Sequence, residues 1–526
     1  MVRLARRLLL LAGLAFTCVS HAGAQTVPSW NLYQGSVSAF LPFADGAMAA
    51  GNYGKISTTI NGSKAVSFRM DTGSTGIAVS KDYFPDVTGL TNKGPGYIEY
   101  SSSTKYEIGT LFIAPISFVD PTNPGTVIAT AQVEVLRVEQ TCNPYPTNCV
   151  SATGVANMGV GFDRGGILSG APKTGTSVVN ANPFLNLTGI AGVTAKDFGT
   201  LRPGYVITND ATGTGSGVTL GITSALNDAN FAFVQLAPDT KSDAPPAGCP
   251  TCKPWSEETT TVWAAAPGFG GATLTSGLLP DSGLQAPILR DMPDAGLLKG
   301  TSAPGGTVVQ FCLPYSTTNG PCTATGATAA YFQYTVSPPT TSNPFQPANE
   351  VFVKGDPIFN SSIAFYGGLD RVYDAIGGFV GYRQNGQGSS SLYSAVNPIL
   401  SLQGPLTLPS GFMATYPVVL ATNIDSSASS LPTHTRLTAS DVATFSGPIS
   451  GHGHLVIVGG TVVLQGASTY DGGTTVMGGA SLVGTTSSLQ GAIANSGNVT
   501  FNQSTVGTYA GSISGTGSVG VAGGGT

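Results

Sequence analysis

Charged side chains are scarce in this chain of 526 residues: Lys, Arg, Asp and Glu together make up 9% of it, against about 25% in ordinary soluble domains. Nucleic-acid binding requires a clustered basic face that displaces counterions from phosphates. A formal net charge of −5 with only 22 basic residues excludes that class of function. The strong helix formers are also few, whereas 72 glycines and many Ser, Thr and Val residues favour strands and turns. The composition therefore predicts a mostly β protein.

Histidine is almost absent as well. It occurs only at His21, His434, His452 and His454, so the long stretch between the first two contains none. A Ser-His-Asp or Cys-His hydrolase, or a zinc site with histidine ligands, cannot be assembled in that stretch. Any acid–base chemistry there must come from carboxylates, Lys, Tyr or Cys.

Long apolar runs are missing apart from a short one near the N-terminus. A basic head, the apolar run from Leu8 to Phe16 and the small residues Ala22-Gly23-Ala24 are typical of a cleaved secretory signal, which we place at 1–24. The alternative, a membrane anchor, is weaker because the run is too short to span a bilayer. The sequence thus predicts an exported protein, either extracellular or at a bacterial outer-membrane surface.

Seven cysteines occur, and one of them, Cys18, lies inside the predicted signal. An even number of remaining cysteines in an exported chain suggests disulfides. The Cys-Pro-Thr-Cys element at 249–252 could instead be a redox motif, but no βαβ pattern surrounds it. Pairing nearest neighbours predicts three local bridges: Cys142 with Cys149, Cys249 with Cys252, and Cys312 with Cys322.

The C-terminal part of the chain is nearly uncharged and repeats itself. The segment 445–460 recurs at 509–524, an offset of 64 residues, and the only charged side chain beyond Val442 is Asp471. Short apolar strands with Gly-rich corners predict rungs of a parallel β-helix, the alternative being a low-complexity tail. The segment 466–476 resembles the strand repeat of bacterial autotransporter passengers. Because the chain stops inside a repeat copy, the resemblance implies a longer chain that carries an outer-membrane barrel.

Two short carboxylate motifs carry the strongest chemical signal. An alternating strand leads into Asp71-Thr72-Gly73-Ser74, and a second element, Asp281-Ser282-Gly283, follows some 210 residues later. Glycine permits a close turn, and the Thr72 and Ser74 hydroxyls can hold the orientation of Asp71. Two such loops brought face to face would place two carboxylates on one water molecule.

The order of segments around these motifs resembles that of the pepsin family of aspartic proteases. The likeness implies an all-β, bilobal pepsin-like double barrel followed by a parallel β-helix segment. It divides the chain into an N-terminal lobe (25–205), a C-terminal lobe (206–383), a linker (384–404) and passenger repeats (405–526). The matching segments are 53–60 for a first strand, 98–109 for the flap hairpin, 157–162 behind the first catalytic loop, 204–208 and 217–221 near the lobe junction, and 351–359, 363–365 and 379–382 for closing strands of the second lobe.

This resemblance implies an aspartic endopeptidase that hydrolyses peptide bonds in a protein or peptide substrate. Asp71 and Asp281 would be catalytic, sharing one proton and activating a water, with no metal and no cofactor. Tyr100 would be the flap tyrosine. The supporting residues of the site would be Thr72, Gly73, Ser74, Ser282 and Gly283.

Three residues depart from the family's pattern. Ala78 stands where a Trp usually supports the flap tyrosine, and Pro280 has no N–H for a strand ladder. Leu284 stands where a hydroxyl usually orients the second carboxylate, so we expect Asp281 to lack that donor and to have a raised pKa. These departures favour an alternative, a non-catalytic passenger or adhesin that uses a degenerate cleft for binding. The oligomeric state stays open.

Overall fold

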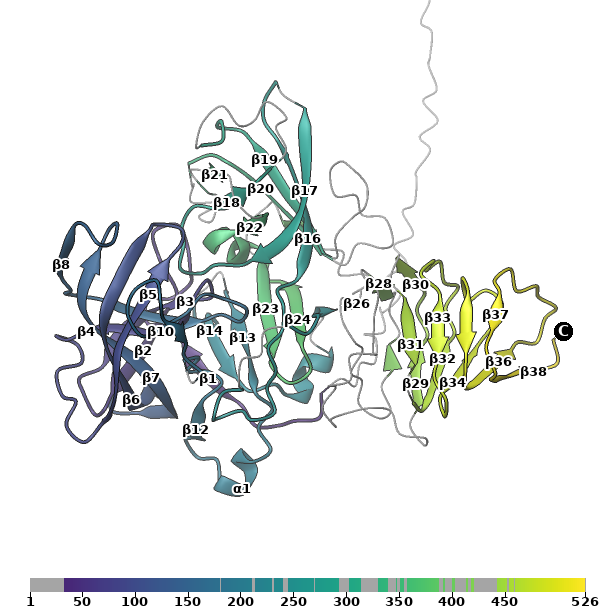
Figure 1. Cartoon of the computed structure of the whole chain (residues 1–526), viewed down its shortest axis with the longest axis horizontal. Coiled ribbons are helices and arrows are strands. Elements are labelled where there is room, and N and C mark those ends of the chain that lie inside the picture. The colour runs from purple at the N-terminus through teal and green to yellow at the C-terminus, as the bar shows by residue number, and fades with distance from the viewer. Residues whose placement is uncertain are drawn as a thin grey trace, which may run out of the picture.

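The protein folds into two β lobes, a sheet they share, and a stack of short strands that ends at the C-terminus (Figure 1). Within the described residues the only α-helix is α1 (Ala195–Phe198), beside two 3-10 turns, η1 (Ser224–Asp228) and η2 (Ser362–Gly367), so the predicted all-β class is confirmed. The predicted signal at 1–24 lies outside the described residues. The computed structural model describes residues 33–179, 181–210, 213–228, 231–239, 245–268, 270–292, 302–313, 330–338, 347, 351–353, 357–386, 391–392, 400–402, 413–414, 418–420, 442–451, 454–457 and 459–525.

The first lobe is an eleven-stranded sheet that closes on itself where β6 pairs with β7. In β3, Phe68 and Met70 are buried in the core while Ser67 and Arg69 lie on the other face, so the strand alternates as its sequence predicts. Its strands are β11 (Thr176–Ser177), β10 (Leu168–Ser169), β5 (Thr91–Tyr100), β6 (Lys105–Val119), β2 (Lys55–Ile60), β3 (Val66–Asp71), β9 (Ala156–Val160), β4 (Thr75–Ser80), β7 (Val127–Cys142), β12 (Leu187–Ile190) and β8 (Cys149–Ser151).

The second lobe is built on an eight-stranded sheet. Pro280 follows the last residue of β17, so it takes no place in the ladder and the expected conflict with strand pairing does not arise. The segment 363–365, expected as a closing strand, lies instead in η2, because the chain turns at Ser362 with a φ of 54°. In order across the sheet the strands are β21 (Val351–Val353), β18 (Ile288–Arg290), β22 (Ile358–Asn360), β17 (Gly271–Leu279), β16 (Thr259–Ala265), β19 (Val308–Leu313), β20 (Ala330–Thr335) and β25 (Ser391–Leu392).

A nine-stranded sheet, which we call the platform, joins the lobes to the C-terminal stack. Within it, β15 pairs with β24 on one side and in parallel with β26 on the other, and β28 and β30 continue the sheet. The strands β25 and β26 fall within 384–404, the predicted linker; the domain boundaries stay a prediction. The platform strands are β1 (Ala39–Pro42), β14 (Gly217–Leu220), β13 (Gly204–Thr208), β23 (Leu369–Asp374), β24 (Phe379–Gln384), β15 (Ala232–Gln235), β26 (Leu400–Leu402), β28 (Val418–Leu420) and β30 (Ile449–Gly451).

The C-terminal stack is a parallel β-solenoid, as the sequence predicts. Its register does not follow the 64-residue offset of the repeat copies: Ile513 stacks on Ile493, Thr474 and Leu455 in turn, and not on Ile449. The number of residues in each rung depends on the lengths of its Gly-rich corners, and these lengths differ from rung to rung. One sheet contains β27 (Met413–Ala414), β29 (Val442–Phe445), β32 (Thr461–Leu464), β34 (Ser481–Gly484), β36 (Asn498–Asn502) and β38 (Ser518–Ala522); the other contains β31 (Leu455–Ile457), β33 (Thr474–Val476), β35 (Ile493–Asn495) and β37 (Ile513–Ser514).

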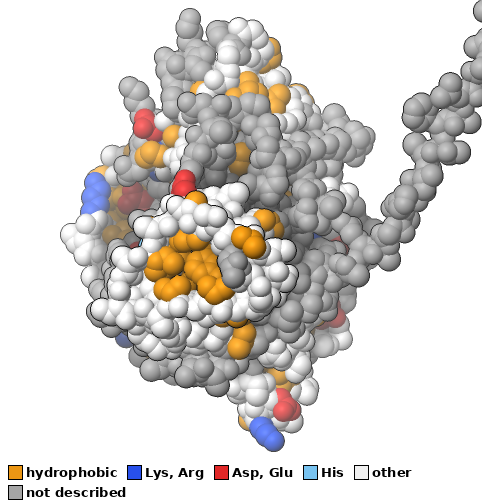
Figure 2. All heavy atoms as spheres, turned by 90° about the vertical axis from the view of Figure 1, so that its right-hand side faces the viewer, with side chains coloured by type: hydrophobic (Ala, Val, Ile, Leu, Met, Phe, Trp, Pro, Cys, Tyr) orange, Lys and Arg blue, Asp and Glu red, His pale blue; other side chains and the backbone are white. Residues whose placement is uncertain are grey.

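The last described rung of the solenoid presents apolar side chains to the outside. Figure 2 looks onto this end, and hydrophobic side chains gather in the middle of it. Val519 and Val521 are 51% and 64% exposed, whereas their in-register partners in β36, Val499 and Phe501, are 1% and 7% exposed. The inward side of each rung is therefore buried only where another rung covers it.

Two of the predicted disulfides are present, Cys142–Cys149 at the β7–β8 hairpin and Cys249–Cys252. Both are therefore confirmed as local bridges. Cys312 is also disulfide-bonded, and its predicted partner Cys322 lies outside the described residues. No helix in the described ranges has the length and apolar character needed to cross a membrane.

Candidate active site

Each lobe presents one carboxylate loop by the same arrangement of strands. In the first lobe β9 lies between β3 and β4, parallel to β3, with Asp71 opposite Gly159. In the second lobe β22 lies between β17 and β18, parallel to β17, with Leu279 opposite Asn360. In each lobe the carboxylate loop follows a strand that pairs in parallel with the middle strand of the three, and the two loops face each other.

The two loops are in direct contact through their glycines. A Cβ atom on Gly73 would lie 2.4 Å from Cγ of Asp281, and one on Gly283 would lie 2.5 Å from Cγ of Asp71. Either substitution would push the opposite carboxylate away, because non-bonded carbon atoms in contact lie about 3.5–4.0 Å apart. Both positions require glycine, because any side chain would occupy the space of the opposite carboxyl. Without side chains there, Asp71 and Asp281 approach closely enough to hydrogen-bond each other.

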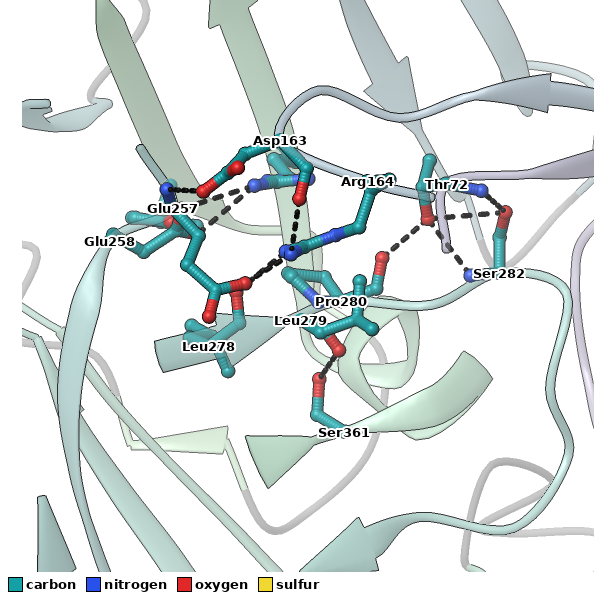
Figure 3. A network of polar contacts seen from close by, with 12 residues as sticks. Thr72, Asp163, Arg164, Glu257, Glu258, Leu278, Leu279, Pro280, Ser282 and Ser361 are labelled. Carbon is teal, nitrogen blue, oxygen red and sulfur yellow. Dashed lines mark hydrogen bonds and ion pairs between the residues drawn. The ribbon is translucent and has the colours of Figure 1, made fainter. Parts of the chain in front are cut away.

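Thr72 and Ser282 brace the loops against each other. The Thr72 amide donates to Oγ of Ser282 at 3.1 Å, and the Ser282 amide donates to Oγ1 of Thr72 at 2.9 Å. The Thr72 hydroxyl also donates to the carbonyl of Pro280 (Figure 3). The Ser282 hydroxyl donates to the carbonyl of Met70 at 2.9 Å. The expectation that Thr72 orients Asp71 is therefore wrong, since its hydroxyl is directed across the lobe boundary.

Each carboxylate accepts one amide and one side-chain hydrogen bond. Asp71 accepts from the Gly73 amide at 2.7 Å and from the Ser74 hydroxyl at 2.6 Å, as expected for Ser74. Asp281 accepts from the Gly283 amide at 2.8 Å and from Nδ2 of Asn360 at 2.7 Å. Leu284 supplies no donor, as expected, but Asn360 provides one from another strand.

Asn360 was not among the residues that the sequence indicated. It follows the apolar residues Ile358 and Phe359 at the end of β22, and its side-chain Oδ1 accepts from the Ser362 amide at 3.0 Å. The sequence does contain one indication of its role, a polar residue at the end of an apolar strand. Nothing local in the sequence links it to Asp281, because the contact exists only through the pairing of β22 with β17.

The environment of the second carboxyl favours its protonated form. Burial raises the pKa of Asp281 to about 7, and the charge of Asp71 adds to the rise, while the donors on Asn360 and Gly283 oppose it. The expected direction is thus confirmed, but its main cause is burial and not a missing hydroxyl. Below about pH 7, Asp281 holds the proton of the pair while Asp71 accepts hydrogen bonds that suit a charged carboxylate.

A second brace between the lobes lies beside the loops (Figure 3). The buried side chain of Arg164, which follows β9, forms an ion pair with Glu257 and donates to the Leu278 carbonyl at 3.4 Å. The Glu257 amide in turn donates to the Asp163 carboxylate at 2.9 Å. These contacts fix the end of β17, just before Asp281, to the first lobe.

The predicted flap tyrosine lies at the tip of the β5–β6 hairpin and faces the same cavity as the carboxylates. Its hydroxyl donates to Glu107 at 3.1 Å and accepts from Asn157 at 3.2 Å, and Glu107 also pairs with Lys105 at 2.6 Å. Tyr100 packs against the cluster that contains Ala78. The hydrogen bonds to Glu107 and Asn157 therefore hold the ring of Tyr100 in place beside Ala78.

The carboxylates lie on the wall of a cavity of about 350 Å³ that both lobes form. Tyr100 and the adjoining serines of the β5–β6 turn line it from the first lobe, and Ile288, Ile358 and Asn360 line it from the second. The chain therefore brings together every residue that the sequence predicted for the site, with Thr72 and Ser282 behind the cavity wall.

Comparisons with known proteins add little to this geometry. No protein-family model and no curated protein matches the chain. Among solved structures it is similar to an aspartic proteinase from Irpex lacteus, with 12% sequence identity and a TM-score of 0.37 over 69% of this chain and 100% of that one. A likeness this distant transfers no function, so only the chain's own residues can indicate one.

Replacing Asn360 by Ala is expected to move the basic limb of a pH–activity profile upward by about one pH unit, because a hydrogen bond to the charged form of Asp281 is lost. The measurement is the rate of peptide cleavage as a function of pH. Asn186→Ala removes another buried amide, far along the chain from Asp281, and is expected to leave the profile in place. An unchanged profile for Asn360→Ala would show that the amide has no influence on the pair.

Proposed function

We propose that this protein is an aspartic endopeptidase in which Asp71 and Asp281 activate one water molecule. The observation that carries the proposal is the reciprocal packing of each carboxyl against the glycine of the other loop. Two buried carboxyls therefore lie together at one cavity, and the raised pKa of Asp281 supports one proton shared by the pair.

The reaction follows from this division of protons. Asp71, as the base, takes a proton from the water, whose oxygen attacks the carbonyl carbon of the peptide bond. Asp281 donates its proton to the carbonyl oxygen, so a neutral tetrahedral diol forms. As the C–N bond breaks, the proton on Asp71 passes to the leaving nitrogen and a diol hydroxyl returns its proton to Asp281, which restores the starting pair.

We further propose that the enzyme is exported and that the solenoid is its stalk in an autotransporter passenger. Local disulfides support export, because such bonds persist in oxidising compartments. The parallel stacking of the repeat region supports the passenger assignment. The alternative of a non-catalytic adhesin loses its main support, since Asn360 supplies the donor that Leu284 lacks.

A peptide that carries a tetrahedral hydroxyl in place of the scissile carbonyl distinguishes an active pair from a degenerate cleft. An active pair is expected to bind it at least about 100-fold more tightly than the matched ordinary peptide, because the pair is complementary to the transition state. Isothermal titration of both peptides against the full chain measures the ratio. Equal affinities would argue against catalysis and for a simple binding cleft.

A further inference from the structure

Two arginines line the cavity of the carboxylates, and the mechanism above uses neither. Arg69 comes from the first lobe and Arg290 from the second. Within the described part of the chain, neither side chain forms an ion pair. A guanidinium beside a substrate cavity with no acidic partner is open to a ligand that supplies one.

Arg69 is held beside the first carboxylate by the alternation of β3. Residues two apart on a strand point to the same face, so Arg69 and Asp71 share the cavity face while Met70 is in the core. The Arg69 guanidinium lies over the ring of Tyr53, 5.1 Å from its centre, and Tyr53 lines the same cavity. Its Nε atom is buried and has no hydrogen-bond partner.

Arg290 occupies the opposite wall. In the antiparallel pair of β18 and β22, Ile288 lies opposite Asn360 and Arg290 lies opposite Ile358. All four residues line the cavity, so Arg290 shares a face with the amide that holds Asp281. One arginine thus flanks the carboxyl pair on each side.

The other charges around the cavity are already accounted for. Lys105 pairs with the buried Glu107 at 2.6 Å. Glu99 is exposed at the rim, where water and salt screen its negative charge. The positive charge left for a ligand is therefore that of Arg69 and Arg290.

We propose that the cavity selects peptide segments with acidic side chains, Asp or Glu, on the residues that flank the scissile bond. This inference rests on the proposed function, because it assumes that a peptide substrate lies across the two carboxyls. The planar fork of a guanidinium matches a carboxylate with two parallel hydrogen bonds, and a neutral side chain would leave its donors unpaired. The substrate class is thus an acidic protein segment.

Two peptides of equal length test the inference, one with Glu and one with Gln on both sides of a central bond. Their binding to the full chain carrying Asp71→Asn is measured by fluorescence anisotropy, so that binding is read without cleavage. The Glu peptide is expected to bind about tenfold more tightly. In a chain that also carries Arg69→Gln and Arg290→Gln the ratio is expected to fall to about one, whereas the control Lys196→Gln, on the exposed helix α1, keeps it.

The outcomes separate this inference from the proposed function. Equal binding of the two peptides by the chain with both arginines overturns the acidic preference, whether or not the arginine variants fold. Cleavage of an unstructured protein by the wild type that requires both carboxyls would still support the protease. Selective binding of the Glu peptide without any such cleavage would support the acidic site and overturn the protease.

Discussion

Replacing Asp281 by Asn is expected to lower the rate of peptide cleavage by about 10³-fold. Asn has nearly the same shape but cannot give a proton to the substrate's carbonyl oxygen and receive it back in each cycle. Asp71→Asn is expected to cause a similar loss, because it removes the base that accepts the water's proton. The measurement is the initial rate on an unstructured protein between about pH 3 and pH 7, because Asp281, with a pKa of about 7, holds its proton over most of this range.

The same substitution is expected to change how stability depends on pH. The pKa of Asp281 is about 7 in the folded protein against an ordinary value of 3.8, so between these values the folded state binds more protons than the unfolded state. The free energy of unfolding of the wild type therefore falls as pH rises from about 4 to about 7, by up to about 4 kcal/mol. Asn does not titrate, so Asp281→Asn removes this part of the decline and is more stable than the wild type at neutral pH.

Urea unfolding of both chains across this pH range checks the prediction. Asp86→Asn is the control, because hydrogen bonds from Thr88 lower the pKa of that exposed carboxyl and its effect has the opposite sign. Two results would contradict the proposal: cleavage that survives in both Asp71→Asn and Asp281→Asn, or equal pH dependence of stability in the wild type and Asp281→Asn. The first would overturn the mechanism, and the second would show that the carboxyls are not buried together.

The sequence could single out the two carboxylates that the structure brings together because the information about them is local. A strand that alternates, an Asp at its end and a glycine after it can all be read within ten residues, and both loops show that order. That the carboxylates meet required a tertiary contact, which the resemblance supplied. The reciprocal role of Gly73 and Gly283 could not be predicted, since it depends on the distance between lobes.

The remainder of the site could not be read from the sequence because its contacts join distant parts of the chain. Asn360 reaches Asp281 across 79 positions, and Thr72 reaches Ser282 across 210. The missing hydroxyl at Leu284 could be read from the sequence, but the donor that Asn360 supplies from another strand could not. The hold on Tyr100 by Glu107 and Asn157 was missed for the same reason.

In the C-terminal region, too, the contacts between distant parts of the chain could not be predicted from the sequence. Its repeats predicted a solenoid, because short apolar strands and glycines recur along the chain. The structure continues the platform into the solenoid through β26, β28 and β30, and one hydrophobic cluster contains Phe233 and Phe379 of the platform with Phe445 and Leu464 of the solenoid. Periodicity identifies a repeat but not the sheet edge on which the first rung is built.

Removing one partner of the buried ion pair between Glu258 and Arg371 is expected to cost about 3–5 kcal/mol of stability. The two side chains are 0% and 3% exposed, and the guanidinium donates to both carboxylate oxygens, at 3.0 and 3.3 Å. Tyr382 also donates to Glu258, and the Arg371 guanidinium lies over the ring of Phe162. Glu258→Gln would leave a positive charge without its partner among apolar and aromatic groups, and the free energy of unfolding in urea measures the cost.

The double variant Glu258→Gln with Arg371→Met separates the ion pair from the packing around it. In the double variant both charges are gone, so no buried charge is left unpaired, and Met keeps much of the apolar packing of the arginine stem. We therefore expect the double variant to be more stable than Glu258→Gln alone. Arg371 also stands next to Tyr366, whose hydroxyl is 3.3 Å from that of Thr72, so the single variant should slow cleavage as it loosens the brace behind the carboxyls. If the double variant is as unstable as the sum of the two single variants, the ion pair contributes no interaction of its own to stability.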